Sequence, residues 1–314
     1  MSFLGRIAYH AWFRPRSELR DLWLDGGPRE RRRTRRGRED MEQAMASLAV
    51  PSNGAGPPLE LHLVTGRRFC HQTAFCLLSF ARQCGRAIAP RLYDDGTLGG
   101  EEREVLGRLF PHTTVVTAAE TLERLEQYLP VDRFPALRER WSNYPNLRKL
   151  IDPHLGRSGW KLVLDSDLLF FRRPEFLLDW LSAPDRPLHA VDCETSYGYS
   201  RPLLSSLAGG PLADLVNVGL TGLDSAAIDW ERLEHWVQTL HAREGTNYYL
   251  EQALVAMVVA GHECAVAPEN DYVTRPSPAE AVRCRAVMHH YVAHSKRWYY
   301  QHNWRRFAGP TYRP

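Results

Sequence analysis

Short apolar segments alternate with longer amphipathic segments from about residue 59, and this alternation constrains the fold more than any other feature of the sequence. Residues 61–66 (LHLVTG) have the composition of a buried strand, residues 71–84 have helical periodicity, and residues 87–96 (AIAPRLYDDG) read as a second strand that ends in a turn. The same order of elements continues to residues 160–171 (WKLVLDSDLLFF). Strands that alternate with helices predict an α/β domain with a mostly parallel sheet.

The length and composition of the chain exclude several classes of protein. Its 314 residues are 44% hydrophobic and 25% charged, so the chain is long enough to bury one large core or two closely packed halves. The longest apolar stretch, residues 253–261, is far shorter than the roughly 18 residues that a transmembrane helix needs. Six cysteines without a Cys-x-x-Cys pair indicate buried, reduced thiols in a cytoplasmic protein.

The basic residues are concentrated near the N-terminus. Residues 1–40 have a net charge of +5 and the rest of the chain has a net charge of −2, so the body gives no reason to expect nucleic-acid binding. Residues 29–38 (RERRRTRRGR) contain seven arginines, which predicts a solvated, mobile charge run. Residues 50–58 (VPSNGAGPP) have the composition of a linker. We therefore expect a basic leader and linker at 1–58 and a single folded domain at 59–314.

The leader also suggests a weak contact with an anionic membrane. Its apolar residues Phe3, Leu4, Trp12 and Phe13 would accompany the arginines at such a surface. The leader has no uninterrupted apolar core of the kind a secretory signal needs. We therefore expect a cytoplasmic protein that is at most peripheral to the inner face of the membrane.

The strongest local motif is Asp165-Ser166-Asp167, which lies inside a run of aliphatic and aromatic residues. On a strand, this spacing places both carboxylates on the same face. At the carboxyl end of a strand, it makes a pair of oxygen ligands that face a ligand crevice. Buried carboxylates need a counter-charge, so we expect a metal ion or strong donors beside Asp165 and Asp167.

Two enzyme classes have Asp-x-Asp after an apolar strand. In phosphatases of the haloacid-dehalogenase type, the motif resembles Asp-x-Asp-x-Thr or Asp-x-Asp-x-Val and lies near the start of the domain. Here the fifth position is Leu169, and the motif lies about a hundred residues into the domain. Both facts disfavour a phosphatase.

The second class is the nucleotide-sugar glycosyltransferases of the GT-A fold. The C-terminal segment 290–298 (HYVAHSKRW) resembles the His-Phe-x-Gly-x-x-Lys-Pro-Trp segment of glycogenin-like, family 8 retaining transferases. In that family the His completes the metal site and the Lys binds the donor diphosphate. The resemblance therefore implies that Asp165, Asp167 and His290 hold a metal and that Lys296 binds the donor. Ala293 and Arg297 replace the family's Gly and Pro.

Further segments resemble the family in the same order along the chain. Asn217-Val218-Gly219-Leu220 is similar to its Asn-Ser-Gly-Val strand, Glu251-Gln252 to its Asp-Gln pair beside the donor sugar, and Asp192 to its sugar-binding Asp. The resemblance implies catalytic roles for Gln252, Glu251 and Asp192. It also implies that the donor is bound by a set of basic and polar residues. These are Arg148, Lys149, Thr65 and Asn217, together with Lys296.

The resemblance implies a GT-A-like α/β domain that transfers a sugar, with retention of configuration, from a nucleotide-sugar donor such as a UDP-sugar to a glycan, lipid or protein acceptor. A divalent cation, Mn²⁺ or Mg²⁺, suits two carboxylates and one imidazole, and would stabilise the charge that develops on the departing diphosphate. The alternative is a non-catalytic protein of the same fold that binds a nucleotide sugar or a glycan.

Two groups of residues have alternative interpretations. Asp94 and Asp95 precede Gly96 and are most simply turn formers. A set of aromatic residues near the C-terminus either packs that end of the chain or stacks on an acceptor sugar. These residues are Trp298, Tyr299, Tyr300 and Trp304.

Overall fold

The structure, a computed structural model, describes residues 26–50, 56–195 and 197–309, and it contains a large and a small β-sheet. In spatial order, the large sheet consists of β3 (Thr114–Val116), β2 (Ile88–Asp94), β1 (Leu59–Thr65), β4 (Trp160–Leu164), β7 (Val216–Asp224), β6 (Leu188–Val191) and β8 (Ala265–Val266). The small sheet consists of β5 (Leu168–Phe170), β10 (Met288–His290) and β9 (Tyr272–Thr274).

Most neighbours in the large sheet are parallel. Strand β1 pairs in parallel with both β2 and β4, β2 pairs in parallel with β3, and β6 pairs in parallel with β8. Strand β7 is antiparallel to β4 and to β6, and its pairing with β6 has an irregularity between His189 and Ala190. The predicted α/β class with a mostly parallel sheet is therefore confirmed.

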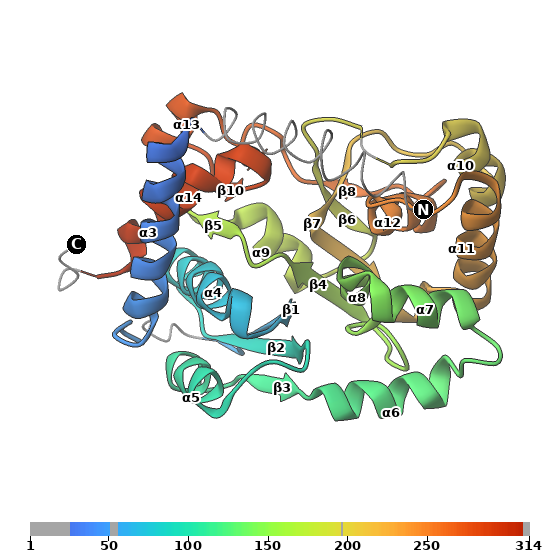
Figure 1. Cartoon of the computed structure of the whole chain (residues 1–314), viewed down its shortest axis with the longest axis horizontal. Coiled ribbons are helices and arrows are strands. Elements are labelled where there is room, and N and C mark those ends of the chain that lie inside the picture. The colour runs from blue at the N-terminus through green and yellow to red at the C-terminus, as the bar shows by residue number, and fades with distance from the viewer. Residues whose placement is uncertain (1–25, 51–55, 196, 310–314) are drawn as a thin grey trace, which may run out of the picture.

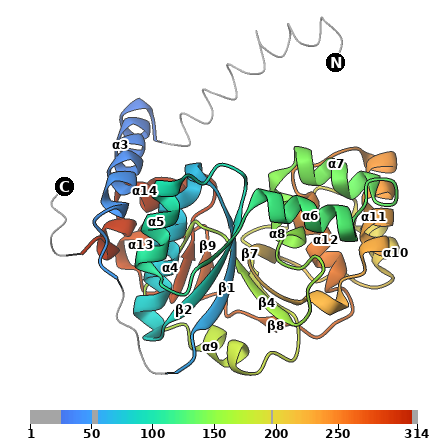
Figure 2. The ribbon, with the colours of Figure 1, turned by 90° about the horizontal axis from the view of Figure 1, so that it is seen from below.

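Helices cover both faces of the large sheet (Figures 1 and 2). The helices are α3 (Pro28–Met45), α4 (Cys70–Cys84), α5 (Gly100–Leu109), α6 (Ala118–Tyr128), α7 (Pro135–Asn143), α8 (Arg148–Ile151), α9 (Glu175–Ser182), α10 (Arg201–Ala208), α11 (Trp230–Glu244), α12 (Leu250–Val258), α13 (Pro278–Arg283) and α14 (Lys296–Gln301). Two hydrophobic clusters result. One contains side chains of α3, α4, α5 and α14, and the other contains side chains of α6, α7, α8 and α10–α12. Among the described residues, no helix combines the length and the apolar character that crossing a membrane requires.

The N-terminal segment differs from the prediction. We expected a mobile charge run at 29–38, but the structure has the 18-residue helix α3 there, which packs against α14. Its buried residues Gly37, Met41 and Ala44 are spaced by four and three positions, and Leu48 continues this spacing after the helix. Arginines occupy much of the remaining helix surface. Because they dominate the composition of this segment, the narrow apolar stripe was not recognised in the sequence. The apolar residues predicted to contact a membrane lie outside the described residues.

Two further segments are divided where we expected continuous elements. The helical stretch predicted at 134–155 consists of α7, a short 3-10 turn at Pro145–Leu147 and α8. The strand predicted at 160–171 consists of β4 and β5, which belong to different sheets. The Asp-x-Asp motif therefore lies in the turn between two strands and not within one strand.

Candidate functional site

A cavity of about 490 Å³ lies at the carboxyl ends of β1, β4 and β6. This volume is within the range of pockets that bind small molecules. All eleven predicted site residues line it. They are Thr65, Arg148, Lys149, Asp165, Asp167, Asp192, Asn217, Glu251, Gln252, His290 and Lys296. Residues that are up to 231 positions apart in the sequence are thus brought together in one cavity.

Asp165, Asp167 and His290 form a cluster with the composition of a metal site. One potential ligand atom from each residue lies within 4.8 Å of the others. The Nε2 atom of His290 is 3.4 Å from Oδ1 of Asp167 and 3.7 Å from Oδ2 of Asp165. Two carboxylates and one imidazole nitrogen suit a divalent cation such as Mn²⁺ or Mg²⁺, so the residues present fit the metal that the sequence predicts.

The two sheets hold this cluster in place. Strand β10 pairs with β5 so that His290 lies opposite Leu168, directly after the two aspartates. The N–H of Tyr291 donates to the carbonyl of Asp167 at 3.1 Å, and the N–H of Asp165 donates to the carbonyl of Gly219 at 2.8 Å. The turn is therefore fixed by backbone hydrogen bonds to both β7 and the β10 segment.

Two lysines balance the charge of the aspartates. The Nζ atom of Lys296 is 3.0 Å from Oδ2 of Asp167, and that of Lys149 is 2.7 Å from Oδ1 of Asp165 and 3.3 Å from Oε1 of Glu251. Burial alone would raise the pKa of Asp167, but the charge of Lys296, together with the neighbouring His290, outweighs burial and holds this pKa well below its usual range. Asp167 is therefore ionised at neutral pH and available as a ligand.

Lys149 lies between the carboxylates of Asp165 and Glu251. Burial lowers the pKa of Lys149, but the charges of Asp165 and Glu251 outweigh burial and raise this pKa above its usual value. Burial raises the pKa of Glu251 to about 8, because Lys149 only partly offsets burial and the charge of Asp165 adds to it. Glu251 therefore takes up a proton more readily than an ordinary glutamate.

The other two predicted catalytic residues lie beside the cluster and bond to each other. Oδ2 of Asp192 accepts hydrogen bonds from Nε2 of Gln252 at 2.8 Å and from Nδ2 of Asn217 at 3.3 Å. Oδ1 of Asp192 accepts from the N–H of Cys193 at 2.7 Å. Asp192 is thus held as an oriented carboxylate at the cavity wall.

Arg148 and Thr65 line the cavity, but their polar atoms have protein partners. Nε of Arg148 donates to Asp152 at 3.0 Å, and its guanidinium lies 4.5 Å above the ring of Trp141. The hydroxyl of Thr65 is 2.7 Å from that of Thr73. These contacts tie both side chains into the walls.

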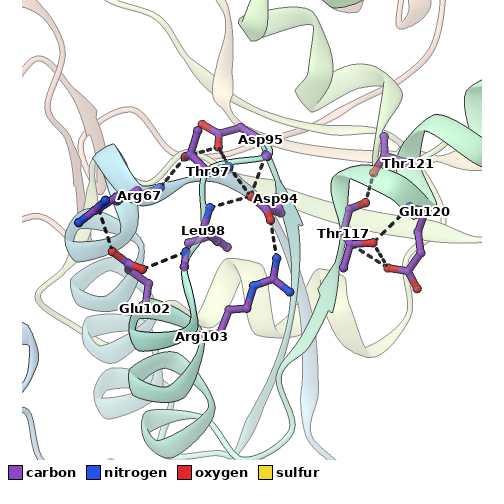
Figure 3. Close-up of polar contacts among 12 residues, drawn as sticks. Arg67, Asp94, Asp95, Thr97, Leu98, Glu102, Arg103, Thr117, Glu120 and Thr121 are labelled. Carbon is purple, nitrogen blue, oxygen red and sulfur yellow. Dashed lines mark hydrogen bonds and ion pairs between the residues drawn. The ribbon is translucent and has the colours of Figure 1, made fainter.

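The turn after β2 is also settled by the structure (Figure 3). Oδ1 of Asp94 accepts the N–H groups of Gly96, Thr97 and Leu98 at 2.8–3.1 Å, and its Oδ2 pairs with Arg103 at 2.7 Å. Asp94 is therefore a turn former, as its sequence context predicts.

The aromatic alternatives at the C-terminus are settled in favour of packing. Tyr299 and Trp304 are fully buried, Tyr300 is 9% exposed, and Trp298 packs against the same hydrophobic cluster. These side chains anchor the C-terminal segment to the domain.

The sequence analysis did not single out the aromatic residues at the cavity itself. Phe69, Tyr248 and Tyr249 line the cavity and are 38%, 71% and 39% exposed. Exposed rings beside a polar cavity suit stacking on a base or a sugar. The Tyr-Tyr pair directly before the predicted Glu-Gln pair is the sequence signal that could have identified two of them.

The likeness to known proteins is structural. No known family model matches the chain, and no curated protein sequence does. Galactosyltransferase LgtC, solved with donor and acceptor sugar analogues, superposes with a TM-score of 0.52 at 14% identity over 82% of this chain and 98% of LgtC. Mouse xyloside xylosyltransferase 1 gives 0.49 at 14% identity over 74% of this chain and 97% of that one. The superposition on LgtC confirms the predicted GT-A-like fold.

A third solved structure is considerably longer than this chain. The bifunctional glycosyltransferase WbbM gives a TM-score of 0.49 at 11% identity over 76% of this chain. The match covers 47% of WbbM, so this chain spans about half the length of that protein.

Proposed function

We propose that this protein is a metal-dependent glycosyltransferase that moves a sugar from a nucleotide-sugar donor, a UDP-sugar, to a glycan, lipid or protein acceptor. One observation carries the proposal: the Asp165–Asp167–His290 cluster and Lys296 meet in the same cavity as the Asp192–Gln252 pair. The first group suits a diphosphate with its cation, and the second suits sugar hydroxyls. The LgtC-like fold agrees with this arrangement.

The cation would be Mn²⁺ or Mg²⁺, held by Asp165, Asp167 and His290. When bound, it supplies Lewis-acid stabilisation of the charge that develops on the departing nucleoside diphosphate. Lys296 contributes a second positive charge to the same leaving group, and its contact with Asp167 holds it at the cavity. The leaving-group side of the cavity is thus positively charged in the loaded protein.

On the sugar side, Asp192 and Gln252 hold the donor sugar, and the partly buried Lys149 keeps Glu251 beside it. Asn217 and Gln252 both donate to Oδ2 of Asp192, whereas Oδ1 accepts the N–H and the weak thiol donor of Cys193. A sugar hydroxyl would replace the thiol at Oδ1. The acceptor attacks the anomeric carbon from the leaving-group side, which gives retention. The exposed Tyr248 and Tyr249 at the mouth suit an acceptor sugar.

The test is a donor-cleavage screen. Purified protein is incubated with UDP-, GDP- and other nucleotide sugars, with Mn²⁺ or with chelator, beside the variant Asp167→Ala. We expect metal-dependent release of UDP from one donor and no release by the variant. Metal-dependent binding without cleavage in the presence of candidate acceptors would favour the non-catalytic binder, and absence of nucleotide binding would contradict both functions.

We also propose that the protein works at the cytoplasmic face of an anionic membrane, through α3. Six arginines of α3 are exposed, and only two of the six are within ion-pair distance of an acidic residue among the described residues. They are Arg29, Arg31, Arg32, Arg33, Arg35 and Arg36. Each such charge near an anionic surface is worth about 1 kcal/mol at most and is screened by salt.

Co-sedimentation with vesicles tests this proposal. We expect binding to vesicles that contain phosphatidylserine, loss of binding at high salt, and no binding to neutral vesicles. Replacing Arg31, Arg32 and Arg35 by Gln should abolish vesicle binding without changing donor cleavage. Equal binding to neutral vesicles would contradict a charge-based contact.

A further inference from the structure

Asn217 makes more contacts than a donor-binding residue needs, and they connect the two halves of the site. It lies on β7 next to the irregularity in the β6–β7 pairing, and it is 3% exposed. Its amide has hydrogen-bond partners on the β7 backbone, on His290 and on Asp192. β-Bulges next to active sites commonly aim a side chain at a particular target.

The backbone fixes the orientation of this amide. The N–H of Gly219 is 2.9 Å from Oδ1 of Asn217, and a backbone N–H can only donate. The atom that faces Gly219 is therefore the carbonyl oxygen. Nδ2 then turns toward Asp192, where it donates to Oδ2 at 3.3 Å. If the amide were flipped, its NH₂ group would face the N–H of Gly219, and its carbonyl oxygen would face the carboxylate of Asp192. Both contacts would be unfavourable.

The orientation of Asn217 determines which nitrogen of His290 carries the proton. Nδ1 of His290 is 3.1 Å from Oδ1 of Asn217, and this oxygen only accepts, so Nδ1 is the donor. A neutral imidazole has a single N–H. Nε2 therefore carries the lone pair, and it faces Asp165 and Asp167.

We propose that Asn217 is a positioning residue that keeps His290 in the Nδ1–H form and thereby presents Nε2 to the metal. Without Asn217, the competing form would have its proton on Nε2, and this N–H would donate a hydrogen bond to Asp167. Neither Nε2 nor that carboxylate oxygen would then be available to a metal ion. This inference rests on the proposed function, because it takes a metal ion as the ligand of Nε2. It assigns Asn217 a role other than the donor contact that the family resemblance implies.

Two substitutions separate the contacts of this amide. Asn217→Ala removes the acceptor for His290 and the donor for Asp192. Asn217→Asp keeps an acceptor for His290 and for Gly219, but it replaces the donor to Asp192 by a second carboxylate. We expect Mn²⁺ affinity without nucleotide to fall about 10- to 100-fold in Asn217→Ala and not to fall in Asn217→Asp, whose negative charge lies beside His290. Donor affinity should fall in both.

The first readout is calorimetric Mn²⁺ binding, and the second is long-range ¹⁵N–¹H NMR of the metal-free protein, which distinguishes Nδ1–H from Nε2–H. His290→Gln identifies the signal of His290 among the 13 histidines. We expect the Nδ1–H form in the wild type and in Asn217→Asp, and the Nε2–H form in Asn217→Ala. Thermal unfolding shows that each variant is folded.

An Nε2–H form in the wild type would overturn the inference, and so would unchanged Mn²⁺ affinity in a folded Asn217→Ala variant. Equal losses of Mn²⁺ affinity in the Ala and Asp variants would also overturn it, because a merely structural role predicts that result. Failure of the proposed function is a distinct result: the wild type would then neither bind Mn²⁺ nor cleave a donor, whatever form His290 takes.

Discussion

Strands β2 and β4 both lie parallel to β1, and each leads into a pair of acidic residues. After β2, the carboxylate of Asp94 accepts three N–H groups of its own turn. After β4, the partners of the Asp165 and Asp167 carboxylates among the described residues are the side chains of Lys149, Lys296 and His290. The aspartate after β2 thus binds the backbone of its own turn, whereas the aspartates after β4 bind side chains from other segments.

The difference indicates how to separate a structural acid from one that can bind a ligand. Backbone N–H groups are fixed by the chain, so the carboxylate of Asp94 is committed to the turn. Lysine side chains have several rotatable bonds and can move when a cation replaces them. Asp165 and Asp167 can therefore exchange their partners, whereas Asp94 cannot do so without opening its turn.

The largest effect that this comparison predicts is on activity. Asp167→Asn removes one anionic ligand and leaves Lys296 without its partner, so we expect metal-dependent donor cleavage to fall by about 10³-fold. The unfolding temperature should change little, because the turn is held by the backbone bonds of Asp165 and Tyr291. Steady-state donor cleavage and thermal unfolding measure the two effects. A variant with more than a tenth of wild-type activity would contradict the metal role.

The reciprocal substitution is Asp94→Asn. It keeps the shape of the side chain but weakens three hydrogen bonds. It also removes the ion pair with Arg103, which solvent screens only partly because Asp94 is buried. We expect the free energy of unfolding to fall by about 2 kcal/mol, or roughly 3 °C in unfolding temperature.

Donor affinity of the folded Asp94→Asn variant should stay within about threefold of the wild type. Glu101→Gln, at an exposed acidic residue in the first turn of α5, is the control for the loss of a charge. A catalytic defect in Asp94→Asn at unchanged stability would break the comparison, because Asp94 would then act on the ligand.

The alternation of strands and helices was predictable because apolar periodicity is local. The sequence also predicted residues that line one cavity, because they belong to short motifs, and their roles stay predictions. The division of residues 160–171 into β4 and β5 was not predictable, because their partners β7 and β10 lie far along the chain. Nor was the commitment of Arg148 to Asp152, which depends on how α8 packs.

A smaller effect is expected from the backbone behind the metal cluster. A Cβ atom at Gly219 would overlap the imidazole of His290, so Gly219→Ala should displace Nε2 and lower Mn²⁺ affinity by about tenfold. Gly222→Ala is the matched control on the same strand, because its Cβ would overlap Trp180 instead. We expect the control to lose stability and keep Mn²⁺ affinity in calorimetry. Equal Mn²⁺ affinities in both variants would show that Gly219 does not help to position His290.

A further prediction concerns pH and the carboxylate that shares Lys149 with Asp165. Burial raises the pKa of Glu251 to about 8, so the fold favours the protonated form. The resulting stabilisation is fully present below the unfolded pKa of 4.5 and is lost as the pH rises toward 8. Relative to Glu251→Gln, the metal-free wild type should lose on the order of 1 kcal/mol per pH unit across this window.

Urea unfolding of both proteins at pH 5, 6, 7 and 8 measures this difference. A difference that does not change with pH would show that Glu251 is ionised throughout, as a full partner of Lys149. Glu251 would then resemble Asp165 and Asp167, because a lysine would balance its negative charge.

The contact between the first and last helices has a consequence for biosynthesis. Gly37 of α3 packs against the carbonyl of Tyr300, and Gln301 donates to Thr34 at 2.9 Å, more than 260 residues earlier in the sequence. On the ribosome, α3 emerges long before α14, so its apolar stripe has no complete partner until α14 has been translated. Until then the exposed arginines of α3 surround this stripe with charge.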